Sequence, residues 1–129
     1  MIDLRIGKPG VKPETYDDDA SIIELGLTGG LSGRVVLNME HLTALEIISK
    51  MMMQQVETID EIGRSAISEL GNMIAGNAAT VFASNNIMID ITPPDYHEGG
   101  QYCGKGQQML SIPFQSDAGA ISVDIAIAE

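Results

Sequence analysis

Several residue types are scarce in this 129-residue sequence, and each shortage argues against a class of protein. Seven basic residues stand against eighteen acidic ones, so the formal net charge of −11 should repel nucleic acids and anionic membrane surfaces. The single cysteine, Cys103, cannot form an internal disulfide, which favours a reducing compartment. No apolar run approaches the ~18 residues of a membrane span, and the N-terminus lacks a signal-peptide pattern. We therefore expect a cytoplasmic protein that binds neither nucleic acid nor membrane.

Aromatic residues make up only 4% of the sequence and tryptophan is absent, so the core must be aliphatic, with eight methionines as flexible filler. Apolar residues nevertheless account for 44% of the chain, which argues against disorder. A chain of this length can bury a real core, and we expect one domain over residues 1–129.

Familiar site patterns are also missing. His41 and His97 stand apart from any cluster at metal-ligand spacing, and no GxxxxGK[ST] or strand-to-helix GxGxxG occurs. Residues 104–106 (GKG) read as a turn. Cys103 has no neighbouring histidine or helix terminus that would activate its thiol. We expect no metal and no cofactor bound by the chain itself.

Two segments have the spacing of amphipathic helices, residues 40–55 and residues 60–84. In the first, the predicted buried face is Leu42, Leu45, Ile48 and Met52, and Met51–Met53 are interpreted as core filling rather than as a binding surface. In the second, the predicted buried face is Ile67, Leu70, Ile74, Ala78 and Val81. Thr58 or Asp60 is placed to cap this longer helix.

Six segments read as strands: residues 1–7, 20–28, 33–39, 87–92, 107–115 and 120–128. Residues 8–19 and 95–106 read as loops. The 120–128 segment alternates isoleucine and valine with Ser122, Asp124 and Ala126, which predicts one buried face. Because hairpins join neighbouring strands, we expect an α+β, two-layer domain with a mostly antiparallel sheet of about six strands and two long helices on one face.

A polar face runs along the longer helix, opposite its apolar stripe. Ser65, Glu69, Asn72 and Gly76 follow each other at intervals of three or four residues, so their side chains stack on successive turns. Gly76 should leave a dent on this face, whereas Gly71 lies near the apolar side, where it would permit close packing. Taken alone, the pattern also fits an ordinary solvated helix face.

Ser65, Glu69, Asn72 and Pro94 stand as S-xxx-E-xx-N, followed after 21 residues by P. This resembles the signature of the CheC/CheX/FliY phosphatases of bacterial chemotaxis, and the text ELGNMIAGNA looks especially like CheX. The similarity extends from about residue 3 to residue 128. CheC carries two copies of the motif, but residues 40–55 lack the asparagine, so a single-site, CheX-like protein is favoured. Family members carry a helix before the first strand, and this sequence shows none, either because the helix was trimmed away or because this variant lacks it.

The resemblance implies a substrate, the aspartyl phosphate of a CheY-type receiver domain that carries its own Mg²⁺. It implies that Asn72 positions the attacking water and that Glu69 pairs with the receiver's lysine. Ser65, Ile62, Met73 and Gly76 would contact the partner, and Pro94 would shape a strand end. It also implies a homodimer through edge strands, for which residues 120–128 are a candidate. The alternative is a non-catalytic adaptor or dimerisation module that docks a receiver domain or a flagellar switch component.

Overall fold

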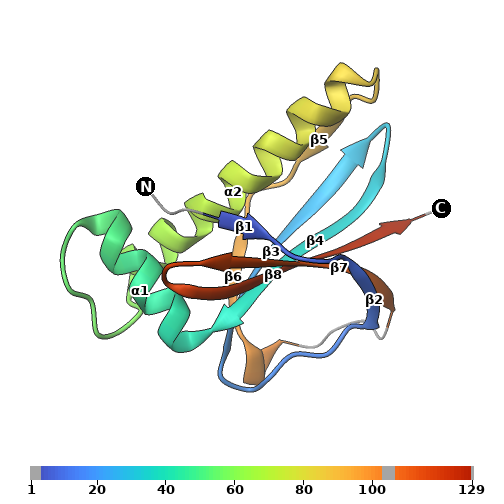
Figure 1. The fold of residues 1–129 in the computed structure, drawn as a ribbon. Helices are drawn as coiled ribbons and strands as arrows, with labels where there is room; N and C mark the ends of the chain where they lie inside the picture. Colours follow the sequence, from blue (N-terminus) through green and yellow to red (C-terminus); the bar gives the residue numbers. More distant parts are fainter. Residues whose placement is uncertain (1–3, 103–106, 129) are drawn as a thin grey trace.

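The computed structural model describes residues 4–102 and 107–128, which form one antiparallel sheet with two helices on one of its faces (Figure 1). The α+β, two-layer architecture predicted from the sequence is therefore confirmed. Cys103 and the turn at 104–106 lie outside the described residues.

The strands are β1 (Leu4–Ile6), β2 (Gly10–Pro13), β3 (Ala20–Gly29), β4 (Ser32–Glu40), β5 (Ile89–Ile91), β6 (Asp95–Glu98), β7 (Gln108–Ser116) and β8 (Gly119–Ala128). The helices are α1 (His41–Met52) and α2 (Glu61–Ser84), and a 3-10 turn, η1, covers Gly99–Gln101. Glycine allows the tight turns of both hairpins, because Gly29 has a φ of +96° and Gly119 a φ of +133°.

The strand order is β1-β7-β8-β4-β3-β5, with β2 also pairing with β7 and β6 also pairing with β3. One row of facing residues crosses the sheet, from Leu25 through Val35 and Ile125 to Leu110. The prediction that residues 120–128 form an edge is wrong, since β8 lies between β7 and β4. The edges of the sheet are formed by β1 and β2 on one side and by β5 and β6 on the other.

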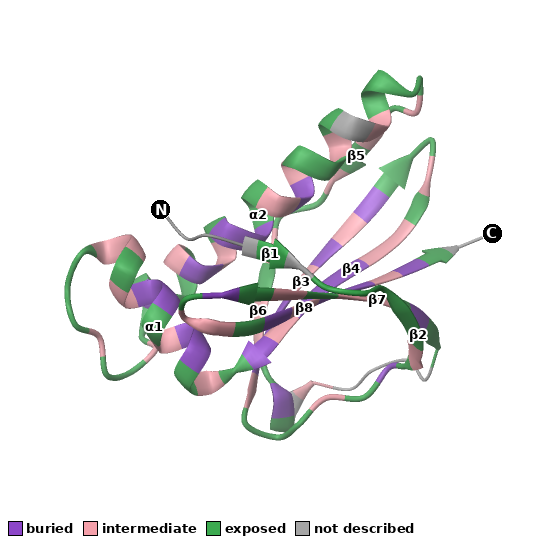
Figure 2. Ribbon diagram, in the orientation of Figure 1, coloured by how far each residue is buried: buried purple, intermediate pink, exposed green. Residues whose placement is uncertain are grey.

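The core lies between the helices and the sheet, where Figure 2 shows the buried parts of α1 and α2 facing β3, β4 and β8. Alternate residues of the strands point into this layer, and Ile23, Leu37 and Ile121 are all at most 2% exposed. Two predicted helix faces were slightly misplaced. Leu42 is 75% exposed while Thr43, Ala44, Ile47 and Ile48 are buried, and Ala75 rather than Ala78 continues the buried side of α2.

The methionine run divides between core and solvent. Met51 and Met52 pack against the core, as predicted, but Met53 is 91% exposed. Met53 occupies the left-handed conformation (φ +57°) at the end of α1, and this turn directs its side chain away from the sheet. The side chain of Val81 is outside the described part of α2.

The second face of the sheet is also covered. Ile22, Val36, Met109 and Ala126 form a separate buried cluster, against which Tyr16 and Tyr102 pack. The segments before β3 and after β5, predicted as loops, contain β2 and β6, and their Tyr16 and Tyr102 cover this face. The expectation of one buried face for residues 120–128 is therefore wrong, and Asp124 is fully buried.

Candidate functional site

The long helix α2 carries the polar face, and its first turn is fixed by a cap. The Asp60 carboxylate accepts a hydrogen bond from the backbone N–H of Gly63 at 2.8 Å, which satisfies one free donor of the helix terminus. Glu61 lies in the first turn, where a negative charge is favourable. Of the two predicted caps, Asp60 is therefore the one used.

Close packing on β3 determines which side of α2 faces outward. Ile67 is completely buried and Leu70 is 7% exposed. A Cβ at Gly71 would lie 2.9 Å from Cγ2 of Ile23 and 3.6 Å from Cδ1 of Leu25, so the helix backbone approaches the strand more closely than an alanine would allow. The predicted close-packing role of Gly71 is confirmed, and this contact restricts rotation of α2 about its axis.

The opposite side of α2 is open to solvent. Ser65, Glu69 and Asn72 are exposed, and Gly76 has no atoms within 4 Å of where a Cβ would stand. Ser65 donates to the Glu61 carbonyl at 3.2 Å. Within the described part of the chain, the side chains of Glu69 and Asn72 make no hydrogen bond or ion pair, so both are available to another molecule.

Two large apolar side chains flank this polar face. Ile62 is 64% exposed and Met73 is 54% exposed. Together with Ser65, Glu69, Asn72 and Gly76 they form what we call the α2 surface. Exposure of Ile62 and Met73 is the arrangement that the sequence predicts for partner contacts, and their contact role stays a prediction.

Pro94 is half-buried in the link between β5 and β6. This link is tied to β3 by two hydrogen bonds, from the Thr92 N–H to the Gly26 carbonyl (3.0 Å) and from the Gly26 N–H to Oγ1 of Thr92 (2.7 Å). Since β3 also supports α2, the link and the helix are fixed to the same strand. Pro94 stands directly before β6, and its role in shaping a strand end stays a prediction.

One residue beside the α2 surface was missed from the sequence. The guanidinium of Arg64 lies over the ring of Tyr96, with Cζ 5.4 Å from the ring centroid. No sequence signal marks this pair, because Tyr96 belongs to a segment that reads as a loop. In the described ranges, no group of three or more His, Cys, Asp or Glu is arranged to hold a metal ion, and no helix there combines the length and apolarity that cross a membrane.

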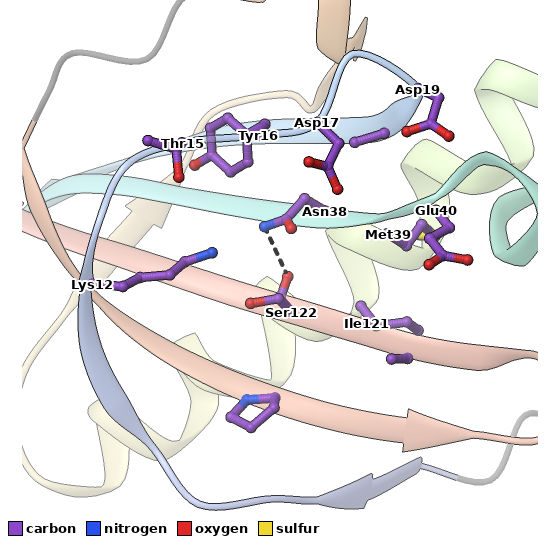
Figure 3. Close-up of a pocket in the computed structure, with 13 residues that line it drawn as sticks. Lys12, Thr15, Tyr16, Asp17, Asp19, Asn38, Met39, Glu40, Ile121 and Ser122 are labelled. Atoms are coloured by element: carbon purple, nitrogen blue, oxygen red, sulfur yellow. Dashed lines mark hydrogen bonds between the residues drawn. The ribbon is translucent and has the colours of Figure 1, made fainter.

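The face of the sheet opposite α2 holds a polar network. Asp124 accepts hydrogen bonds from Asn38 (3.0 Å) and Ser122 (2.8 Å) and pairs with the ammonium of Lys12 (3.2 Å). Beside it is a pocket of about 330 Å³. Figure 3 shows that Lys12, Tyr16 and Asn38 line this pocket, with Asn38 also bonded to the Ser122 carbonyl at 3.5 Å. The sheet separates this pocket from the α2 surface.

A second part of the network centres on Arg34. Its guanidinium contacts both Glu14 (2.6 Å) and Glu24 (3.1 Å), and the Tyr102 hydroxyl donates to Glu24 at 2.6 Å. The hydrogen bond to Glu14 raises the pKa of Arg34. Although burial favours the neutral acid, the hydrogen bonds from Tyr102 and Arg34 lower the pKa of Glu24. Burial raises the pKa of Tyr102 and of Tyr16, and nearby carboxylates add to both shifts.

The family model described as "Chemotaxis phosphatase CheX" matches residues 21–115. The chain belongs to the CheX family. Among curated proteins, the CheY-P phosphatase CheX of Thermotoga maritima is 34% identical over 99 residues. That match covers 76% of this chain and 64% of the relative, so the chain spans slightly less than two thirds of the relative's length.

Solved structures of related proteins share the fold. CheX in the CheX–CheY–BeF3–Mg²⁺ complex from Borrelia burgdorferi superposes with a TM-score of 0.79 at 33% identity, covering 98% of this chain and 84% of that one. A CheC-like protein from Shewanella sp. PV-4 has a TM-score of 0.82 at 26% identity, with 98% and 85% covered. Membership of the family and its fold, predicted from the motif, is thus confirmed.

Proposed function

We propose that this protein is a phosphatase that hydrolyses the aspartyl phosphate of a CheY-type receiver domain. The observation that carries the proposal is that Glu69 and Asn72 are both exposed on the outward side of a rigid helix, with no hydrogen bond or ion pair to their side chains from the described residues. The names of the relatives support it, since one is a CheY-P phosphatase and another was solved with CheY.

Asn72 is proposed to position the attacking water. Hydrolysis of an acyl phosphate proceeds through a loose transition state that needs an in-line nucleophile and neutralised charge. A carboxamide donates and accepts hydrogen bonds, so Asn72 can hold a water in line with phosphorus. The receiver supplies charge neutralisation through its Mg²⁺ and lysine. Ordering the water lowers the barrier because positional freedom is removed before reaction.

Glu69 is proposed to pair with the receiver's lysine. It precedes Asn72 by one helical turn, so an ion pair there fixes the register in which Asn72 meets the phosphoryl group. A carboxylate placed beside that group would be repelled, so Glu69 does not act as the general base. Ser65, Ile62, Met73 and Gly76 complete the contact area, with the apolar pair removing water from its rim.

The experiment measures decay of the aspartyl phosphate on a CheY-type receiver domain, with wild type and with Asn72→Ala. We expect wild type to accelerate decay and Asn72→Ala to lose most of this, on the order of 10²-fold for a positioned reactant, while receiver binding persists. Asn77→Ala is the matched control, because Asn77 is exposed on the same helix but outside the α2 surface. Binding without accelerated decay by wild type would mean that the protein is an adaptor.

We also propose a homodimer formed through sheet edges. Unpaired edge strands invite pairing with another chain. The edge of β2 carries Val11, which is 72% exposed beside the half-exposed Leu110. The opposite edge carries exposed Asp95 and Glu98 on β6, which would repel each other across a symmetric interface. The β2 edge is therefore the favoured contact.

The cytoplasmic location of the protein stays a prediction from the sequence.

A further inference from the structure

Arg64 is the only basic residue of α2, and it forms no ion pair within the described part of the chain. Lys12 and Arg34 form ion pairs with buried carboxylates on the far face of the sheet, but no such pair involves Arg64, which is exposed. Asp60, four residues earlier, caps the helix. Arg5, Lys8 and Lys50 are also exposed and outside the ion pairs of the described residues, so what distinguishes Arg64 is its position beside the α2 surface.

The side chain of Arg64 is nevertheless held in one direction. Its guanidinium lies over the Tyr96 ring, and the Tyr96 hydroxyl is 3.1 Å from Oγ of Ser21. Tyr96 itself packs against the core. This contact uses the face of the Tyr96 ring and no N–H hydrogen bond of the guanidinium, so these groups can donate to a partner, and it reduces the side-chain entropy that a new contact would cost.

Arg64 belongs to the same helix ridge as Asn72. Arg64, Ser68 and Asn72 follow at intervals of four residues, the spacing that forms a continuous ridge on a helix. At ~1.5 Å per residue, Arg64 lies about 12 Å before Asn72 along the axis. A typical interface buries about 800 Å² on each partner, which is wide enough to cover both positions.

We propose that Arg64 is a docking residue that pairs with a carboxylate on the surface of the receiver domain. Glu69 and Arg64 then present opposite charges within two helical turns, so a receiver must offer a cation and an anion at matching positions. The two opposite charges restrict which receiver domains can bind and fix the direction in which the receiver lies along α2. The inference rests on the proposed function.

The test compares wild type, Arg64→Gln and Arg64→Lys in binding to both phosphorylated and unphosphorylated receiver, and in kcat and KM for dephosphorylation. We expect Arg64→Gln to weaken binding and raise KM by roughly two- to five-fold, the range of an exposed ion pair, with kcat unchanged. The loss of binding should be equal for the phosphorylated and the unphosphorylated receiver. Arg64→Lys should recover most of the loss, and the salt dependence of binding should be shallower for Arg64→Gln.

Lys50→Gln is the matched control, since it removes one exposed cation from the last turn of α1. An equal effect of Lys50→Gln would overturn the proposal, because net charge alone would then explain the change. A loss confined to the phosphorylated receiver, with lower kcat, would mean that Arg64 contacts the phosphoryl group instead. If wild type is active and Arg64→Gln binds the receiver as tightly as wild type does, only the docking role of Arg64 is refuted. If wild type neither binds nor dephosphorylates the receiver, the proposed function is refuted as well.

Discussion

Two glycines of α2 differ in what surrounds them, and the difference decides the effect of adding a methyl group. Alanine is favoured over glycine in a helix by ~1 kcal/mol. At Gly76 nothing opposes this gain, since no atom lies within 4 Å of the added Cβ. At Gly71 the methyl would stand 2.9 Å from Cγ2 of Ile23, a branched core side chain with little room to move.

Gly76→Ala should therefore raise the free energy of unfolding by about 0.5–1 kcal/mol, whereas Gly71→Ala should lower it by about 1–3 kcal/mol through overpacking. Urea denaturation of both variants measures the two effects. Gly76→Ala should also weaken receiver binding, because its methyl fills the dent in the α2 surface. Equal stability of the two variants would show that α2 does not lie as close to β3 as described.

At the scale of elements, the strand edges determine how two copies can meet. We expect a particle of twice the 13.7 kDa chain mass in sedimentation equilibrium. Val11→Asp should shift it toward the monomer, because a charge at the exposed β2 edge has no partner across the interface. Glu98→Gln, on the opposite edge, is the control and should leave the mass unchanged. Monomeric wild type contradicts the dimer, and dissociation by Glu98→Gln alone would assign the interface to β6.

Long elements could be predicted from the sequence because their periodicity is their own property. Both helices and the two long hairpins were found for this reason. The four-residue strands β2 and β6 were missed, since their conformation comes from pairing with β7 and β3 and not from their proline-, glycine- and aspartate-containing sequences. The burial of Asp124 was missed because its partner Lys12 lies on β2.

The candidate site was predictable for the same reason as the helix that carries it. Helical spacing predicted that Glu69 and Asn72 face outward, and both are exposed, but only the resemblance of the S-xxx-E-xx-N motif singled them out from an ordinary solvated helix face. Arg64 could not be found in this way, because its orientation depends on Tyr96, a residue of an edge strand that reads as a loop.

At the scale of the whole molecule, the polar network opposite α2 makes stability depend on pH. The pKa values of Tyr16 and Tyr102 are raised above the ordinary value of 10.0, chiefly by burial. A raised pKa in the folded state means that the stabilisation is complete below pH 10 and is lost as the pH rises further, since the unfolded chain releases the protons more readily.

The free energy of unfolding should accordingly fall above about pH 10, and tyrosinate absorbance should appear together with unfolding. Tyr102→Phe removes one of the two phenols and should make this fall shallower. Urea titrations at a series of alkaline pH values measure the slope. Full ionisation of Tyr16 and Tyr102 in a protein that remains folded would contradict the burial of these two hydroxyl groups.

The central position of β8 has a consequence for synthesis. This strand is the last described element of the chain, yet it pairs with both β4 and β7 in the middle of the sheet. On the ribosome, β3, β4 and both helices emerge first, and the inner edge of β4 stays unpaired until residues 119–128 leave the exit tunnel. The sheet therefore cannot close in stages behind the emerging chain, and the nascent chain exposes the unpaired edge of β4 until β8 emerges.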